Sequence, residues 1–172
     1  MCVKTINSGG ASTCVRGFTL IELIMVIVIL GILSVYATSQ VTSSATVNAN
    51  GLHSNAMSYL RYAQKAAIAQ RRTVCVSFPS STTLQLQIAS AAPELAAGLT
   101  CDTALTGPRG ESPALLSAGS GTSFGSTPSV LWFDALGQPI DATGTILSGT
   151  QTIKIAGMAD IQVEAWTGYV HE

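Results

Sequence analysis

The chain has 172 residues, of which 47% are hydrophobic and only 10% are charged. Eight basic and nine acidic side chains give a formal net charge of −1, so the chain as a whole has no general electrostatic attraction for nucleic acid. Low charge with abundant Ser, Thr and Gly is more typical of an extracytoplasmic β-rich module than of a cytosolic enzyme.

Residues 18–37 form an apolar run that contains a single ionisable side chain, Glu22. A helix needs about 20 such residues to cross a bilayer core, so the run predicts a transmembrane helix. A carboxylate there costs roughly 2.5 to 3.5 kcal/mol and requires a partner. Cleavage between Gly17 and Phe18 would create a positive amino terminus one helical turn away, and the same group on a neighbouring copy could neutralise Glu22. The run therefore predicts both proteolysis and self-assembly.

Residues 1–17 carry Lys4 and Arg16 and no acidic residue. Positive charge ahead of an apolar run predicts that this leader stays in the cytoplasm and that the rest of the chain lies outside it. Loss of the leader would leave six basic and nine acidic side chains, a balance of −3, and would remove Cys2 and Cys14.

The order Arg16-Gly17-Phe18-Thr19-Leu20-Ile21-Glu22-Leu23 resembles the prepilin peptidase site of type IV pilins and type II secretion pseudopilins. The resemblance implies that prepilin peptidase cuts after Gly17 and methylates the amine of Phe18. It also implies that Glu22 pairs with a neighbouring subunit during filament assembly. An ordinary secretory signal is the alternative, but its apolar region precedes the cleavage site, whereas this one follows it. A plain membrane anchor would give Glu22 no purpose.

Beyond residue 37 we expect the helix to continue to Arg72, because no proline occurs before Pro79 and apolar residues recur at steps of three and four. This second half, 38–72, is predicted to pack its apolar stripe on the domain, and His53 is predicted to be an ordinary surface residue. A solvated basic face and a DNA-binding face are the two interpretations of its cations, of which we favour the first. These cations are Arg61, Lys65, Arg71 and Arg72.

After residue 72 the hydrophobic period changes to two, and 73–172 is predicted to be one antiparallel β-domain. We expect a hairpin at 73–78 and 83–88 and a long loop region at 89–127 that can contain short strands. Further strands are predicted near 129–133, 145–147, 151–155 and 161–165, which makes about six or seven in all. The predicted class is therefore α+β: a long N-terminal helix, its first half transmembrane, followed by an antiparallel β-domain, as in the pilin and GspH-like fold.

Cys75 and Cys101 remain after loss of the leader. In an oxidising compartment such a pair readily forms a disulfide, although two unrelated buried thiols are the alternative. Neither has a second Cys or a His at metal-ligand spacing, so we expect no zinc site and no other metal.

Two further resemblances concern subgroups of the family. The direct passage from the Ala-rich helix end at 66–72 into a strand resembles GspH/FimT-like pseudopilins and minor pilins. The Phe133-Asp134 turn and the terminal Thr167-Gly168-Tyr169-Val170 resemble minor pilins of the mannose-sensitive haemagglutinin (MSHA) pilus. Two departures matter: Ser39 occupies the neighbourhood where major pilins often carry proline, and the Gly-Arg-x-Arg element of DNA-binding FimT-type members is missing from the tail.

No residues are placed for catalysis by a recognisable motif, and no glycine loop suits a phosphate, so we expect no enzymatic activity and no cofactor. We predict a minor pilin of an MSHA-like type IV pilus, held in the inner membrane with its domain in the periplasm and, after assembly, at the cell surface. Its expected partners are prepilin peptidase, other pilin subunits and the assembly platform. The alternatives are a type II secretion pseudopilin, a DNA-binding competence pilin and a membrane-anchored adhesin with no filament role.

Overall fold

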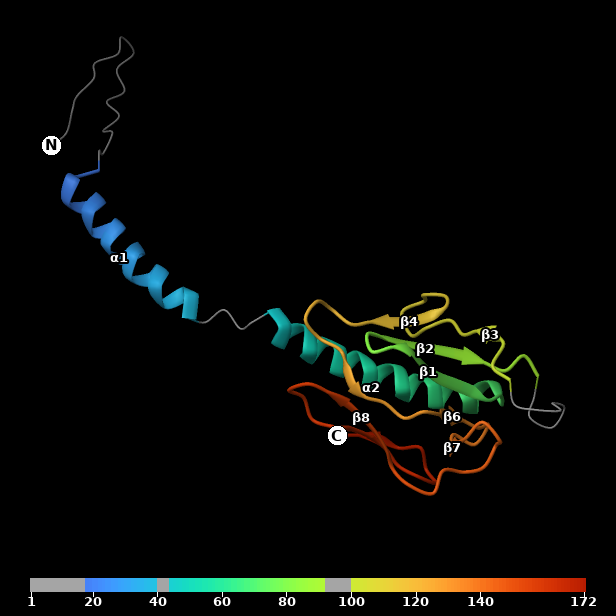
Figure 1. The fold of residues 1–172 in the computed structure, drawn as a ribbon. Helices are drawn as coiled ribbons and strands as arrows, with labels where there is room; N and C mark the ends of the chain where they lie inside the picture. The colour runs from blue at the N-terminus through green and yellow to red at the C-terminus, as the bar shows by residue number, and fades with distance from the viewer. Residues whose placement is uncertain (1–17, 40–43, 92–99) are drawn as a thin grey trace, which may run out of the picture. The chain divides into compact units, whose positions relative to one another are not determined.

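The computed structural model describes residues 18–39, 44–91 and 100–172, and in residues 35–39 it describes the backbone only. The chain divides into two compact units, 1–42 and 43–172 (Figure 1). The first unit contains helix α1 (Leu20–Ser39), and the second contains helix α2 (Ser44–Gln70) and all the described strands. An α+β class with antiparallel sheets is confirmed.

Helix α1 begins two residues later than the predicted start at Phe18 and extends to Ser39. Among the described residues, no helix meets the length and hydropathy that crossing a membrane would require. Continuity of one helix from 18 to 72 was also predicted, but the junction at 40–43 lies outside the described residues.

Helix α2 ends at Gln70 rather than at Arg72 because Arg71 adopts a left-handed conformation, with φ of 51°. The Arg71 amide donates to the Ile68 carbonyl and the Arg72 amide to the Ala67 carbonyl, which closes the last turn. The chain then enters the first strand at Val74. Arg71 therefore sets the boundary between the helix and the sheet.

The first sheet is built on the predicted hairpin, which is confirmed. Its described strands are β1 (Val74–Ser80), β2 (Thr83–Ile88), β3 (Thr103–Ala104), β4 (Ala114–Ser117), β6 (Leu131–Phe133) and β7 (Pro139–Ile140). Val76 on β1 lies opposite Leu86 on β2 and Leu131 on β6, so β1 is central. The predicted first strand ended at Phe78, but β1 continues to Ser80 through a register shift between Ser77 and Ser80, and proline is tolerated at such an irregularity.

The second sheet has the order β10-β9-β8-β5. Its strands are β5 (Phe124–Ser126), β8 (Gln151–Ile155), β9 (Ile161–Val163) and β10 (Val170–His171). The predicted loop region 89–127 thus supplies three short strands, β3, β4 and β5. The predicted strand at 145–147 is reduced to an isolated bridge between Ile146 and Ile140. The described residues form ten strands, more than the six or seven expected, because several pair over only two or three residues.

One face of α2 supplies the centre of the core. The helix packs against strands of the first sheet and against β10 of the second, and Figure 1 shows it alongside β1 and β2. Tyr59 and Leu60 are almost wholly buried, each worth about 1.5 to 3 kcal/mol of transfer free energy. The buried alanines are Ala49, Ala56, Ala63, Ala66 and Ala67. Their small side chains let the backbone of α2 approach the strands closely.

Polar side chains of α2 hold the C-terminal segment through its backbone. Arg61 donates from Nε and Nη2 to the Val170 carbonyl, at 3.2 and 3.1 Å. Gln64 Nε2 donates to the carbonyls of Gly137 and Thr167, at 3.1 and 2.8 Å. The turn after β6 and the segment before β10 are thereby fixed to the same helix, and they meet at Gly168.

Replacing Gly168 with Ala should destabilise the globular unit. Gly168 has φ of 65°, and an added Cβ would overlap the Gly137 carbonyl and approach Gln64 Nε2 at 2.8 Å. Gly157→Ala is the matched control, since Gly157 has φ of 78° but open space around the added methyl. Gly157→Ala should cost about 1–2 kcal/mol from backbone strain alone, and Gly168→Ala measurably more in chemical unfolding of fragment 43–172. Equal costs would show that the close approach at Gly168 is unimportant.

A second contact holds β10 against the loop that follows β9. His171 Nε2 lies 2.8 Å from Glu164 Oε1, and Thr150 Oγ1 donates to Glu164 Oε2 at 3.2 Å. The hydrogen bond to Glu164, with a smaller effect from the Glu172 carbonyl, raises the pKa of His171 above 6.5. The hydrogen bonds from His171 and then Thr150 lower the pKa of Glu164 below 4.5. Both groups are charged between these values.

The contribution of this pair to stability should therefore depend on pH. Because the His171 pKa is raised, its contribution is complete below 6.5 and is lost as pH rises through the folded-state pKa. Because the Glu164 pKa is lowered, its contribution is present above 4.5 and is lost at lower pH. The difference in unfolding free energy between wild type and His171→Gln should be largest between about pH 4.5 and 6.5, and it should decrease as pH rises through the raised pKa of His171. A pH-independent difference would contradict the pairing.

Candidate functional site

The segment from Phe18 to Leu23 forms the start of α1. Phe18 is exposed and precedes the helix, and Thr19 is its N-cap. The Glu22 amide donates to Thr19 Oγ1 at 3.3 Å, and the Leu23 amide donates to the Thr19 carbonyl at 3.2 Å. Thr19 and Glu22 have the spacing of a capping box. The helix thus begins just after the predicted cleavage point between Gly17 and Phe18. Gly17 itself lies outside the described residues.

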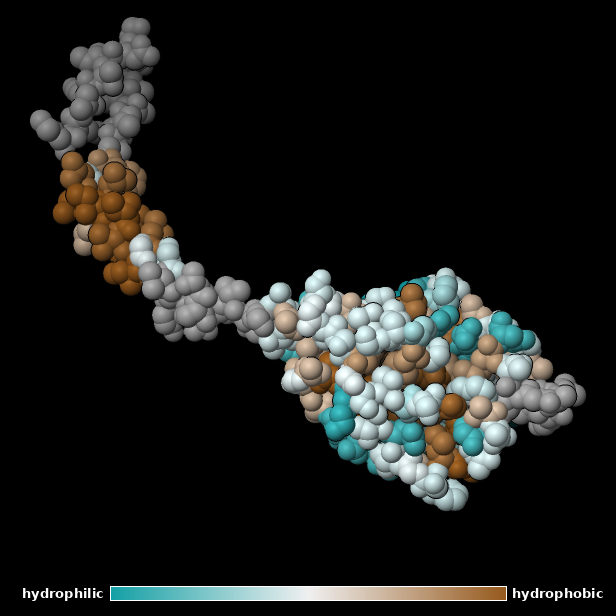
Figure 2. Space-filling view, viewed as in Figure 1, coloured by the Kyte–Doolittle hydropathy of each residue, from teal (hydrophilic) through white to brown (hydrophobic). Residues whose placement is uncertain are grey.

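Glu22 lies in the first turn of α1 and is exposed. Within the described residues its carboxylate makes no hydrogen bond or ion pair. Every large hydrophobic residue from Leu20 to Leu33 is exposed in this unit, and Figure 2 shows hydrophobic colour over most of the visible side of α1. A carboxylate in apolar surroundings is stabilised by a positive partner, and an amino terminus created near the helix start would have the required charge.

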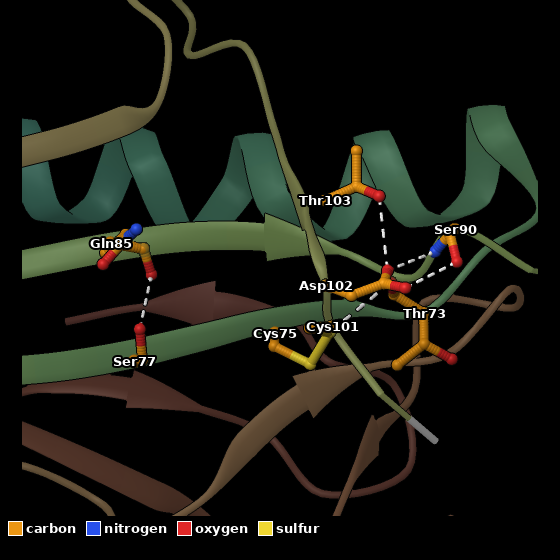
Figure 3. Close-up of a disulfide and its surroundings, with 8 residues drawn as sticks. All are labelled: Thr73, Cys75, Ser77, Gln85, Ser90, Cys101, Asp102 and Thr103. Carbon is orange, nitrogen blue, oxygen red and sulfur yellow. Dashed lines mark hydrogen bonds between the residues drawn. A yellow bond between two sulfur atoms is a disulfide. The ribbon is translucent and has the colours of Figure 1, made fainter. Parts of the chain in front are cut away.

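The predicted disulfide between Cys75 and Cys101 is present. Cys75 on β1 and Cys101, just before β3, form a disulfide with Cα atoms 6.1 Å apart (Figure 3). Asp102, the next residue, accepts from the Ser90 amide at 2.9 Å and the Ser90 hydroxyl at 2.7 Å. These hydrogen bonds keep the pKa of Asp102 below its usual value. The disulfide and Asp102 together fasten both ends of the segment between β2 and β3.

The four cations considered for DNA binding have different surroundings. Arg61 donates two hydrogen bonds to the Val170 carbonyl, so its side chain stabilises the fold. Lys65 and Arg71 are exposed, and Arg72 is half-buried. In the described part of the chain, the side chains of these last three make no hydrogen bond or ion pair. The stripe expected from the sequence is therefore not one uniform basic face.

His53 is buried, with 7% of its surface exposed, and its prediction as a surface residue is wrong. The reason is tertiary: β10 packs against α2, and Glu172 Oε1 lies 3.9 Å from His53 Nδ1. The periodicity of one helix predicts which of its residues pack on a sheet. It does not predict that a segment distant in the sequence will cover the side of the helix that carries His53. Among the described residues, no three His, Cys, Asp or Glu side chains come together in a way that could hold a metal.

Comparison with known proteins finds a family match at the amino-terminal segment. Residues 13–38 match the family described as the Prokaryotic N-terminal methylation motif. No curated protein and no solved structure matches the chain. The matched segment includes Gly17, Phe18 and Glu22, which the sequence assigned to cleavage, methylation and pairing. The chain thus carries an N-terminal methylation motif, which supports a precursor of the type IV pilin-like class.

Proposed function

We propose that this chain is a prepilin that is cut by prepilin peptidase between Gly17 and Phe18, methylated on Phe18 and assembled through α1 into a filament. The match of the methylation motif to residues 13–38 is the observation that carries the proposal. The chain's own role is mechanical, with no catalysis and no cofactor. The leader is cytoplasmic, α1 sits in the inner membrane before assembly, and the globular unit lies in the periplasm.

The physical step of assembly is the transfer of α1 from lipid to a bundle of helices from other subunits. Exposed apolar side chains over its whole described surface suit both environments. Glu22 makes this transfer selective, because a carboxylate in an apolar surrounding is stabilised only by a positive partner. The methylated amine of a neighbouring subunit is the partner we assign to it.

Among filament systems, we propose a minor subunit of an MSHA-like type IV pilus. The sequence features that support it are the absence of proline near Ser39 and the turn and tail motifs. A type II secretion pseudopilin has the same N-terminal chemistry and is the alternative. A DNA-binding pilin is less well supported, since Arg61 is committed to Val170 and the tail has no Gly-Arg-x-Arg element.

Mass spectrometry of sheared surface filaments and of membranes tests the proposal. We expect a peptide that begins at methylated Phe18, present in filaments in a small amount relative to the main pilin. Its abundance in membranes with none in surface filaments would favour the pseudopilin. If only uncleaved chain were found in cells with active peptidase, the prepilin proposal would be wrong and an anchored domain would replace it.

Replacing Glu22 with Ala should leave cleavage intact but reduce incorporation into filaments by about tenfold or more, since the lost pairing is charge-assisted. Glu22→Gln should behave alike, while Glu22→Asp should retain part of the incorporation. Ser34→Ala is the control within the same helix, because the Ser34 hydroxyl only donates to the Leu30 carbonyl of α1. The ratio of processed peptide in filaments to that in membranes measures the effect. Normal incorporation of Glu22→Ala would refute the pairing.

A further inference from the structure

A polar groove lies where strand β4 meets helix α2. The groove has a volume of about 490 Å³, within the range of ligand-binding clefts. It is lined by Leu115, Leu116 and Ser117, which are consecutive on β4. Side chains of consecutive strand residues point to opposite faces of a sheet, so three in a row can line one groove only along the edge of the strand. The groove therefore runs along the backbone of β4.

The outer edge of β4 has free hydrogen-bonding groups. Among the described strands β4 pairs with β2 alone, and Figure 1 shows it at the margin of the first sheet. The Ala118 amide donates to the Thr82 carbonyl at 2.8 Å. By the alternation of an antiparallel ladder, Leu116 directs its backbone groups at β2, whereas Leu115 and Ser117 direct theirs outward. An edge of this kind is a template for another extended chain.

The wall opposite this edge is charged and fixed. The Tyr59 hydroxyl of α2 donates to Glu111 Oε1, and the Arg109 amide donates to Glu111 Oε2 at 3.1 Å. The guanidinium of Arg109 lies over the Tyr59 ring, 5.7 Å from its centroid. The hydrogen bond from Tyr59 lowers the pKa of Glu111, so this carboxylate is ionised and already engaged.

Arg109 is the available charge in the groove. Its side chain is exposed and forms no salt bridge with a described carboxylate, although the Glu111 carboxylate of the same lining lies near enough to interact with its charge. Asn55 adds an amide to the same lining. Leu115, with 43% of its surface exposed, adds an apolar contact beside the edge. The groove thus offers main-chain pairing, an apolar contact and one exposed cation.

We propose that the edge of β4 binds an extended segment of another protein, which adds to the sheet as a strand and presents a carboxylate to Arg109. An extended backbone fits because the free groups of Leu115 and Ser117 recur at strand spacing. A carboxylate fits because it forms charge-assisted hydrogen bonds with a guanidinium.

A second copy of this chain is a poor source of that segment. Every described carboxylate of the globular unit already has a hydrogen bond or an ion-pair partner. These residues are Asp102, Glu111, Asp134, Asp141, Asp160, Glu164 and Glu172. Each of them would have to share its oxygens between that contact and Arg109 of a neighbour, so we assign the segment to a different protein.

Selection of random displayed peptides on the full-length chain in detergent micelles tests this proposal. We expect enrichment of peptides that combine β-branched residues with Asp or Glu. A selected peptide, labelled for fluorescence anisotropy, should bind Arg109→Gln about tenfold more weakly than wild type. Lys65→Gln is the matched control, because Lys65 is an exposed cation of α2 outside the groove, and it should bind normally.

Main-chain pairing is tested separately. Ser117→Pro removes an outward amide from an edge position where proline is tolerated, and it should abolish peptide binding. Methylating alternate backbone nitrogens of the peptide should do the same without any change to the protein. No enrichment, enrichment without acidic residues, or full binding by Arg109→Gln would overturn the proposal. Self-association of the chain that Arg109→Gln removes would assign the groove to a second copy instead.

Discussion

The globular unit depends on the burial of one face of α2. Strands from both sheets lie against this helix, and its alanines bring the backbones close enough for Tyr59 and Leu60 to fill the space between them. Most strands here pair over only two or three residues, so the sheets have few ladder hydrogen bonds of their own. Helix α2 contacts β1, β2, β4 and β6 of the first sheet and β10 of the second, so it joins the two sheets.

The two helices solve different problems with different surfaces. Helix α2 has one apolar face and a polar remainder, so its partners lie within its own chain. Helix α1 is apolar on all sides apart from Glu22 and a few small polar residues, and its described side chains find no core within the first unit. The two helices therefore differ in where their apolar side chains lie: those of α2 are buried in the core, and those of α1 are exposed.

Polar contacts to backbone carbonyls fix the C-terminal segment where hydrophobic packing alone would not. Arg61 and Gln64 reach three carbonyls, and Gly168 passes so near the Gly137 carbonyl that a methyl group would not fit. The cost of this arrangement is visible in Trp166, a bulky residue held at φ of 69°. Arg61 is therefore one of the four cations considered for DNA binding, yet its side chain hydrogen-bonds to the backbone of its own domain.

The sequence alone determined the elements whose signals are local. The helix start after Phe18, the alternating strands of the first hairpin and the motif around Gly17 and Glu22 are all decided by neighbouring residues, through capping, periodicity and charge. The tertiary structure decided what depends on residues far apart: the burial of His53, the engagement of Arg61, the three short strands within 89–127 and the groove between Arg109 and β4. A two-residue strand has no periodicity to detect, and a helix flank is buried only when a distant segment returns to cover it. Those features arise from packing between remote parts of the chain, which no local pattern encodes.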